Sequence, residues 1–251
     1  MNKYLRFVLY TLAIIFSFIS FAFLPVNQQI SSKNIEENQS ENHAPQVKIL
    51  SPKNNSFFSA GAQIPYRISV SDKEDGESKY QEINPEEVFL EIKYVKDSAD
   101  AKELFAKNKE KDEEGLALIK NSNCLNCHEF NAKKIGPSFY NLIQHYKWNP
   151  SIPDSLADHI LNGSKGRWGS VQMPSNNKLN LEEAKKIVNW LYKNAGDSLL
   201  SFLAGTSGSF KLKTNSSLKE AVLIATYTDH GTKDDPSSKL KGEDDIIIHI
   251  R

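Results

Sequence analysis

Alternating apolar and polar positions predict β-strands in two separate parts of the chain, residues 45–98 and residues 198–251. The strands we expect are residues 47–50, 64–70, 88–94, 210–213, 221–228 and 246–250. Each part supplies three strands with one strongly apolar face. Three such strands cannot bury that face as an isolated sheet, so they need a second sheet packed against them.

Between these two parts, in residues 99–197, the strand pattern stops and a helical pattern takes its place. Residues 97–118 are mostly helix formers. Asn180 followed by Glu183 is typical of a capped helix start, in which the asparagine caps and the glutamate is the third helical residue. Apolar residues then recur at helical spacing until Gly196, where the helix is expected to stop. The middle of the chain is therefore predicted to be all-α.

We therefore expect a multi-domain α and β protein, in which an all-α domain (residues 99–197) is inserted into an all-β sandwich. The first half of the sandwich is residues 45–98 and the second half is residues 198–251. An inserted domain needs ends that lie close together, and first and last helices that pack on each other provide them. The alternative is a pair of incomplete β pieces on either side of a helical domain, which would leave apolar faces in water.

Residues 1–26 are predicted to be a signal peptide or a membrane anchor, because Lys3 and Arg6 precede an apolar run over residues 7–24. A cleavage site at residues 20–22 is poor, so cleavage and anchoring both stay open. Positive residues before the run place the rest of the chain on the outer side of the cytoplasmic membrane, periplasmic or otherwise extracytoplasmic. Residues 27–44 are polar and without periodicity, and we expect them to form a flexible linker.

The formal charge is balanced, with 31 basic and 31 acidic residues, which argues against a nucleic-acid partner. The chain has only two cysteines, Cys124 and Cys127. No further thiol exists for a disulfide to another part of the chain or for a four-cysteine metal site.

The two cysteines belong to residues 124–128, Cys-Leu-Asn-Cys-His, which is the pattern of covalent c-type haem attachment. Thiols three residues apart lie on one side of a helical turn, where they can add to the two vinyl groups of one porphyrin. The imidazole of His128 is then carried under the ring with a nitrogen aimed at the iron. The alternatives are a thiol redox pair and half of a zinc site. A redox pair requires a thioredoxin-like βαβ pattern, and a zinc site requires a second pair of ligands. Neither pattern is present.

The iron of such a haem needs a second axial ligand or an open position. Met173 is the only methionine besides the initiator, and it lies in the Gly-rich segment 163–176, which has no helical or strand period. A lone methionine usually fills a gap in a core, but this segment has no core pattern. A thioether ligand favours reduced iron and raises the potential. His145 is the competing candidate for the distal ligand.

Residues 114–195 resemble the small bacterial class I cytochromes c. The motifs that carry the resemblance are Gly115, the Cys-x-x-Cys-His site, Ile135-Gly136-Pro137-Ser138, the Gly-x-Trp-Gly-x-x-x-Met-Pro-x-Asn segment that ends at Asn176, and Trp190-Leu191 in the closing helix. The resemblance implies one haem c, bound through thioether bonds from Cys124 and Cys127. It implies iron ligation by His128 and Met173.

The same resemblance implies roles for five other residues. The carbonyl of Pro137 would accept the N–H of the proximal imidazole, which fixes the orientation of the ring. Trp168 would donate a hydrogen bond to a haem propionate, and Asn176 would contact the methionine sulfur. Gly115 would let the first helix approach the last one. Arg167 is a candidate partner for a propionate, with an exposed side chain as the alternative.

The β parts resemble, more loosely, the immunoglobulin-like sandwiches of the cadherin and PKD type found in bacteria. The resemblance rests on residues 70–76 and 225–231. In such a sandwich these two loops share one end, which would bring Asp72, Asp75 and Asp229 together as a candidate calcium site. The alternative is ordinary turn chemistry, in which Asp and Gly stabilise tight loops.

These features predict a mono-haem electron carrier rather than an enzyme, because two filled axial positions keep oxygen and peroxide from the iron. The expected partners are redox proteins that dock transiently, and the membrane if residues 1–26 stay attached. In an alternative reading the sandwich has the main role, as a docking or glycan-binding module. The cytochrome would then be the dedicated acceptor of a periplasmic, quinoprotein-type dehydrogenase. An open sixth position would instead indicate a haem enzyme or a gas sensor.

Overall fold

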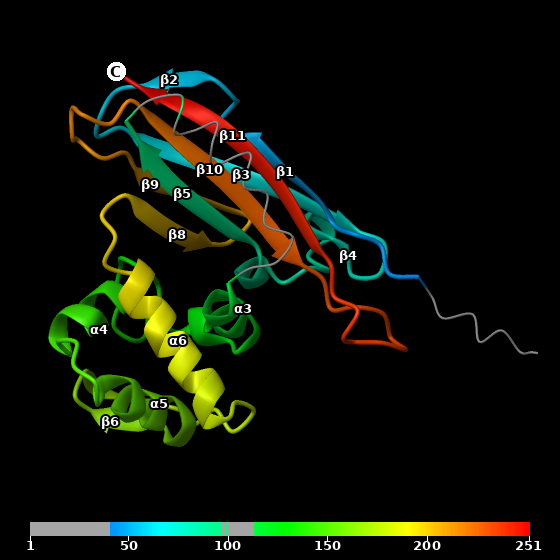
Figure 1. Ribbon diagram of the computed structural model, residues 1–251. Coiled ribbons are helices and arrows are strands. Elements are labelled where there is room, and N and C mark those ends of the chain that lie inside the picture. The colour runs from blue at the N-terminus through cyan, green and yellow to red at the C-terminus, as the bar shows by residue number, and fades with distance from the viewer. Residues whose placement is uncertain (1–40, 97–98, 100–112) are drawn as a thin grey trace, which may run out of the picture. The chain divides into compact units, whose positions relative to one another are not determined.

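The computed structural model describes residues 41–96, 99 and 113–251, which fall within one compact unit, Ser40–Arg251 (Figure 1). The predicted N-terminal segment 1–26, most of the linker 27–44 and most of the helix-forming residues 97–112 lie outside the described residues. Within the described ranges, no helix is long and apolar enough to cross a membrane.

Nine strands form two sheets. The four-stranded sheet has the order β1-β3-β4, with β9 also paired to β3, and the five-stranded sheet has the order β2-β11-β10-β5-β8. The strands are β1 (Gln46–Ser51), β2 (Ser56–Phe58), β3 (Gln63–Asp72), β4 (Gly76–Glu77), β5 (Phe89–Val95), β8 (Leu200–Ala204), β9 (Ser207–Lys211), β10 (Glu220–Thr228) and β11 (Lys241–Ile250). Two short 3-10 turns, η1 (Ser78–Tyr80) and η2 (Pro85–Glu87), lie between β4 and β5.

Both sheets contain strands from the two separate β parts of the chain. β3 pairs with β1 from the first part and with β9 from the second, where Ile64 lies opposite Phe210. β5 lies between β10 and β8, which both come from the second part. The two β parts therefore build one pair of sheets, which confirms the insertion and excludes two separate β pieces. The immunoglobulin-like classification stays a prediction.

The inward faces of the strands are the ones that alternation predicts. In β3 the side chains of Ile64, Tyr66, Ile68 and Val70 are all buried. They pack in one hydrophobic cluster with alternate residues of β5, β10 and β11, among them Leu223. This cluster fills the space between the sheets and needs no residue of the helical region.

The inserted region is helical apart from one hairpin. Its elements are α3 (Glu114–Asn121), η3 (Cys124–Asn126), α4 (Phe139–His145), α5 (Ile152–Asn162), β6 (Ser164–Gly166), β7 (Gly169–Met173) and α6 (Leu181–Asn194). The chain leaves the sheet after β5 and returns at β8, and these strands are antiparallel neighbours in which Lys93 lies opposite Leu200. The helical region thus occupies the connection of a β-hairpin, so its two ends meet at one place on the sheet (Figure 1).

Two helices of this region cross closely where the sequence predicts it. Asn180 and Glu183 form the expected reciprocal cap at the start of α6. A Cβ on Gly115 of α3 would collide with the Cβ of Trp190 and would lie 2.7 Å from the carbonyl oxygen of Lys186. Glycine at position 115 therefore lets the backbone of α3 contact α6 directly.

The short strands β2, β4 and β8 and the hairpin β6–β7 are not among the strands expected from the sequence. β8 was not predicted, because its residues pack on both sides and do not alternate: Phe202 is buried against the helices, and Leu203 packs on the sandwich core. The segment around Met173 was expected to be irregular, but it forms the hairpin β6–β7. Most residues of β7 are exposed, so the hairpin leaves no apolar alternation to detect.

Candidate functional site

The Cys-x-x-Cys-His residues form a single helical turn, η3. Asn123, in the left-handed conformation at φ 57°, starts the turn. The backbone N–H groups of Cys127 and His128 both donate to the carbonyl of Cys124, at 3.2 and 3.0 Å. Both thiols are free, and burial raises the pKa of Cys124 to about 11. The turn therefore places two thiols and an imidazole on a short, hydrogen-bonded segment.

The imidazole of His128 is held in one orientation. Its Nδ1 lies 2.7 Å from the carbonyl oxygen of Pro137, and because a carbonyl only accepts, Nδ1 donates. The ring of Phe139 stacks on the imidazole, with centroids 5.3 Å apart and planes 14° from parallel. Burial lowers the pKa of His128, and the Pro137 bond offsets part of that effect. A neutral imidazole with Nδ1–H donated keeps its lone pair on Nε2, which is what an iron ligand requires.

A tight loop closes back on this turn. The backbone N–H groups of Ile135 and Gly136 both donate to the carbonyl of Cys127, at 3.1 and 2.8 Å. A Cβ on Gly136 would lie 2.6 Å from Cε1 of His128. Only glycine lets the backbone lie against the imidazole edge, and that contact carries the chain on to Pro137.

Met173 is the last residue of β7 and is half-buried. The hairpin pairs it with Ser164, and Gly163, at φ 77°, lets the backbone pass close to the carbonyl of Met173. Asn176 was expected to contact the methionine sulfur. Its Nδ2 donates to the carbonyl of Ser122 at 3.3 Å, and its backbone N–H donates to the carbonyl of Ile160. Asn176 therefore ties the segment after Met173 to the end of α3, two residues before Cys124.

Trp168 and Arg167 lie at the turn of the same hairpin and contact aromatic side chains. The Trp168 ring lies 4.9 Å from the ring of His145 and is partly exposed. Arg167 has its guanidinium over the ring of Tyr146, 5.6 Å from the centroid, and Nη1 lies 3.4 Å from the Tyr146 hydroxyl. The propionate roles expected for these two residues are not tested by these contacts. His145, the competing distal candidate, packs on Trp168.

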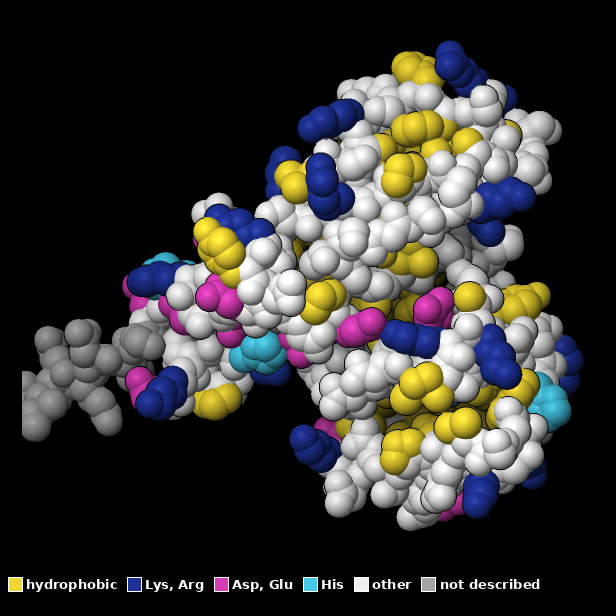
Figure 2. Space-filling model, turned by 180° about the vertical axis from the view of Figure 1, so that it is seen from behind, with side chains coloured by type: hydrophobic (Ala, Val, Ile, Leu, Met, Phe, Trp, Pro, Cys, Tyr) yellow, Lys and Arg dark blue, Asp and Glu magenta, His cyan; other side chains and the backbone are white. Residues whose placement is uncertain are grey.

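Large apolar side chains are exposed around these residues. Figure 2 shows hydrophobic side chains gathered around a hollow in the helical region. The exposed large apolar residues of this region are Ile135, Tyr140, Trp148, Trp168, Val171 and Leu181. Val171, on the strand of Met173, is 65% exposed. An apolar surface beside two thiols and an oriented imidazole fits a porphyrin, which would cover it.

Sequence analysis missed the aromatic packing behind the imidazole. Phe139 and Phe130 are buried and lie 5.1 Å apart, and Phe130 also contacts Phe202 of β8. The available signal was a large aromatic residue at each end of the short loop segment 130–139, which follows His128. Lys134 was also missed: its Nζ donates to the carbonyl of Leu125 inside the haem motif.

The three carboxylates of the predicted calcium site are close together but serve other contacts. The Oδ1 atom of Asp72 accepts two backbone N–H groups, Asp75 accepts the Tyr227 hydroxyl, and Asp229 accepts the N–H groups of Gly231 and Leu240. Burial, and to a smaller extent the charges of Asp75 and Asp229, raise the pKa of Asp72. In the part of the chain that the structure describes, no cluster of three His, Cys, Asp or Glu residues could hold a metal ion. The structure gives the calcium prediction no support.

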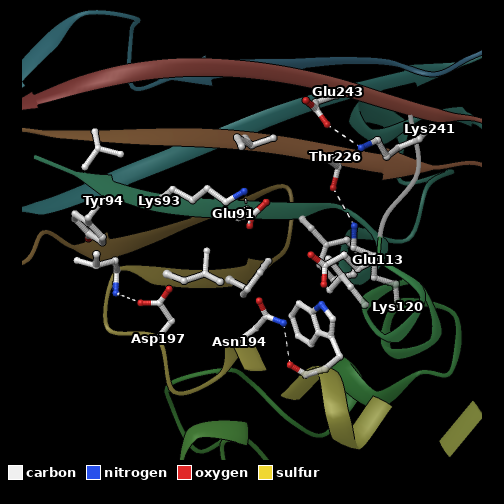
Figure 3. A pocket seen from close by; sticks show the side chains of 18 of the residues that line it. Glu91, Lys93, Tyr94, Glu113, Lys120, Asn194, Asp197, Thr226, Lys241 and Glu243 are labelled. Atoms are coloured by element: carbon white, nitrogen blue, oxygen red, sulfur yellow. Dashed lines mark hydrogen bonds and ion pairs between the residues drawn. The ribbon is translucent and has the colours of Figure 1, made fainter. Parts of the chain in front are cut away.

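A cavity of about 650 Å³ lies between the outer face of the five-stranded sheet and helices α3 and α6 (Figure 3). Two ion pairs line it, Lys93 with Glu91 and Lys241 with Glu243. None of the four residues expected to hold the haem lines it. This cavity is therefore separate from the candidate haem site.

Comparison with known proteins locates the similarity in the helical region. Residues 110–191 match the family described as cytochrome C oxidase, cbb3-type, subunit III. The chain is 38% identical over 74 residues to cytochrome c-552 of Hydrogenobacter thermophilus, which covers 30% of this chain and 74% of that protein. It is 37% identical over 79 residues to cytochrome c-551 of Azotobacter vinelandii, which covers 32% of this chain and 95% of that protein. The crystal structure of wild-type cytochrome c552 of Nitrosomonas europaea is 31% identical, with a TM-score of 0.30, and the match covers 31% of this chain and 95% of that one.

Proposed function

The chain belongs, through its helical region, to the class I cytochromes c of the c-551 and c-552 type, and from this premise we propose a function for the whole protein. The helical region is a mono-haem electron-carrier domain inserted between β-sheet regions. The protein passes single electrons between partner redox proteins. The observation that carries the proposal is the imidazole of His128, which Pro137 and Phe139 hold with Nε2 free for iron.

Four side chains hold the haem in this proposal. Cys124 and Cys127 would form the thioether bonds, and His128 Nε2 and the Met173 sulfur would bind the iron. When bound, the haem supplies an iron that accepts and releases one electron. The protein fixes the ligands: Pro137 orients the imidazole, Phe139 packs on it, and the β6–β7 hairpin positions Met173. Asn176 joins the two sides of the site through Ser122.

Two protein ligands leave no iron position for a substrate, which supports a carrier rather than an enzyme. An optical spectrum tests this directly. The oxidised protein is expected to show a methionine-to-iron charge-transfer band, and the reduced protein is expected not to bind CO rapidly. A missing band, or rapid CO binding, would contradict the carrier assignment.

Replacement of Met173 by alanine tests the distal ligand. Met173→Ala is expected to lower the potential, because a thioether favours reduced iron, and to let the reduced protein bind CO. Val171→Ala is the matched control, since Val171 lies two residues away on the same strand and is exposed. Spectroelectrochemical titration measures both variants. An unchanged potential in Met173→Ala would show that another residue is the ligand.

The location and the partners are part of the proposal. The positively flanked apolar run over residues 7–24 and the covalent haem motif both support a site of action outside the cytoplasmic membrane, periplasmic or otherwise extracytoplasmic. The same segment anchors the protein or is cleaved as a signal peptide, and haem staining of membrane and soluble fractions distinguishes the two. Exposed apolar side chains around the haem site support weak, transient docking of partners.

A second candidate function makes the sandwich a docking module that presents the cytochrome to one dehydrogenase. The observation that favours it is the packing of the sandwich on the helical region, because Phe89 and Phe202 belong to the same hydrophobic cluster as Trp190. A module that only tethers the cytochrome would not need such a cluster.

A further inference from the structure

The loop that follows His128, residues 129–136, is held by the sandwich at three points; we call it the proximal loop. The Phe130 ring lies 4.6 Å from the ring of Phe202 in β8. Asn131 Nδ2 donates to Ser201 Oγ, also in β8, at 2.7 Å. Lys134 Nζ lies 3.0 Å from a carboxylate oxygen of Glu86 in η2. One aromatic contact, one neutral hydrogen bond and one ion pair therefore fix this loop to the β-sheet region.

The other side of the proximal loop faces the haem-attachment turn. Phe130 lies edge-on to Phe139, at 5.1 Å, and Phe139 stacks on the imidazole of His128. Lys134 makes its second contact here, with the carbonyl of Leu125 at 3.1 Å. Two of the three residues that bind the sandwich, Phe130 and Lys134, thus also contact the groups around His128.

The aromatic part of this path is packed as tightly as a protein core. Phe130, Phe139 and Phe202 are at most 5% exposed, and they share one hydrophobic cluster with Trp190. The Trp190 ring lies 5.9 Å from that of Phe130 and 5.4 Å from that of Phe202. Close-packed interiors transmit a displacement instead of absorbing it. A change at Phe202 therefore reaches the imidazole through two intervening rings.

We propose that β8 and η2 clamp the proximal loop and thereby set the orientation of the His128 imidazole toward the haem iron. Phe202, Glu86 and Lys134 are positioning residues, which act on the iron ligand through Phe130, Phe139 and the Leu125 carbonyl. The sandwich is then part of the redox site and tunes its potential, in addition to any role as a spacer. This inference rests on the proposed electron-carrier function.

The first test replaces Phe202 by leucine in the full-length, haem-loaded protein. Phe202→Leu is expected to shift the hyperfine-shifted proton resonances of His128 and to lower the midpoint potential, because looser packing admits water and water favours the more charged ferric iron. Phe57→Leu is the matched control, since Phe57 lies in β2 of the same sandwich and is 59% exposed. It is expected to leave both values unchanged. A purely structural role of Phe202 would lower the melting temperature and move neither value.

The second test uses two exchanges at the ion pair, Glu86→Gln and Lys134→Gln, which do not touch the core. If these residues acted through charge alone, loss of the carboxylate would raise the potential, loss of the ammonium would lower it, and the His128 resonances would move in opposite directions. A clamp predicts that both variants displace the His128 resonances in the same direction, because each releases the same loop.

The outcomes distinguish a failure of the clamp from a failure of the proposed electron-carrier function. The clamp would be overturned if the His128 resonances of all three variants, Phe202→Leu, Glu86→Gln and Lys134→Gln, matched those of the wild type. If the methionine charge-transfer band is intact in the same protein, the electron-carrier function would still stand. Opposite displacements in the two ion-pair variants would also overturn the clamp. Absence of the band in the wild type would instead overturn the ligand assignment on which the clamp rests.

Discussion

The sandwich and the helical region differ in how they obtain a core. Ten of the twelve largest fully buried side chains belong to the sandwich, and only Ile119 and Ile187 belong to the helical region. Phe89 and Phe202 lie on the outer face of the sheet and complete the hydrophobic cluster of the helical region. Six of its large apolar side chains are exposed instead: Ile135, Tyr140, Trp148, Trp168, Val171 and Leu181. The small inserted domain therefore depends on its host sheet for part of the apolar surface of its core.

Removal of the two thiols should have the largest effect, and it should destabilise the helical region while leaving the sandwich folded. In the double variant Cys124→Ala/Cys127→Ala we expect no covalent haem, and we expect the helical region to lose its amide protection because its core is incomplete. The strands β10 and β11 should keep their protection. All three tryptophans, Trp148, Trp168 and Trp190, lie in the helical region, so their fluorescence reports on that region alone.

Hydrogen exchange of the two regions, together with haem staining, checks this expectation. Ser122→Ala is the control, because Ser122 contributes its carbonyl to the contact with Asn176 and its side chain is not needed there. Rapid exchange of β10 in the thiol-free variant would show that the sandwich has no independent core.

A smaller, local effect is expected at the crossing of α3 and α6. Gly115→Ala places a methyl group against Trp190 and the backbone of Lys186, which should destabilise the helical region by about 1–3 kcal/mol. Gly196→Ala is the matched control, because its methyl would meet only the end of the flexible Ile143 side chain, at 3.1 Å. Urea titrations followed by tryptophan fluorescence measure both variants. Equal urea midpoints in the two variants would show that α3 and α6 accommodate the methyl group without a loss of stability.

The smallest expected effect is a loss of stability of the sandwich at alkaline pH. Burial raises the pKa of both Tyr66 and Tyr94 to about 12, and the nearby carboxylates of Glu86 and Glu129 add to the shift of Tyr66. A raised pKa means that the folded state holds protons that the unfolded state releases, so stability falls as the pH rises from about 10 to 12. Tyr66→Phe should flatten this fall in the urea midpoint of the sandwich. A slope identical to that of the wild type would contradict the assignment to Tyr66.

The parts of the fold that alternation controls were predictable from the sequence. The inward residues of β3 follow from period two, and the start of α6 follows from Asn180 and Glu183. The insertion followed from the count of strands with one uncovered face. Strand β8 was not predicted, because its short run, residues 199–204, packs on both sides and shows no alternation. A short apolar run near Gly196 and Gly205 is nevertheless itself a strand signal.

The haem site was predictable in its residue types and less so in its contacts. The Cys-x-x-Cys-His turn and the bond from His128 to Pro137 lie where the motifs place them. The bond from Asn176 was not predicted, because a side-chain amide donates to whichever backbone carbonyl tertiary packing brings near, and here that is the carbonyl of Ser122. The contacts of Phe130 and Lys134 with the sandwich join residues far apart in the chain, so no local spacing could indicate them.

The place of the helical region within a hairpin has a consequence for how the sheet assembles. β5 and β8 are direct neighbours, yet about 100 residues separate them, whereas an ordinary hairpin has a connection of about 4 residues. The extra loop-closure entropy is on the order of 3 kcal/mol. A folded helical region removes most of this cost, since its two ends already meet. Haem attachment would therefore act on the β-sheet as a distant cross-link does, by shortening the effective loop that the sheet must close.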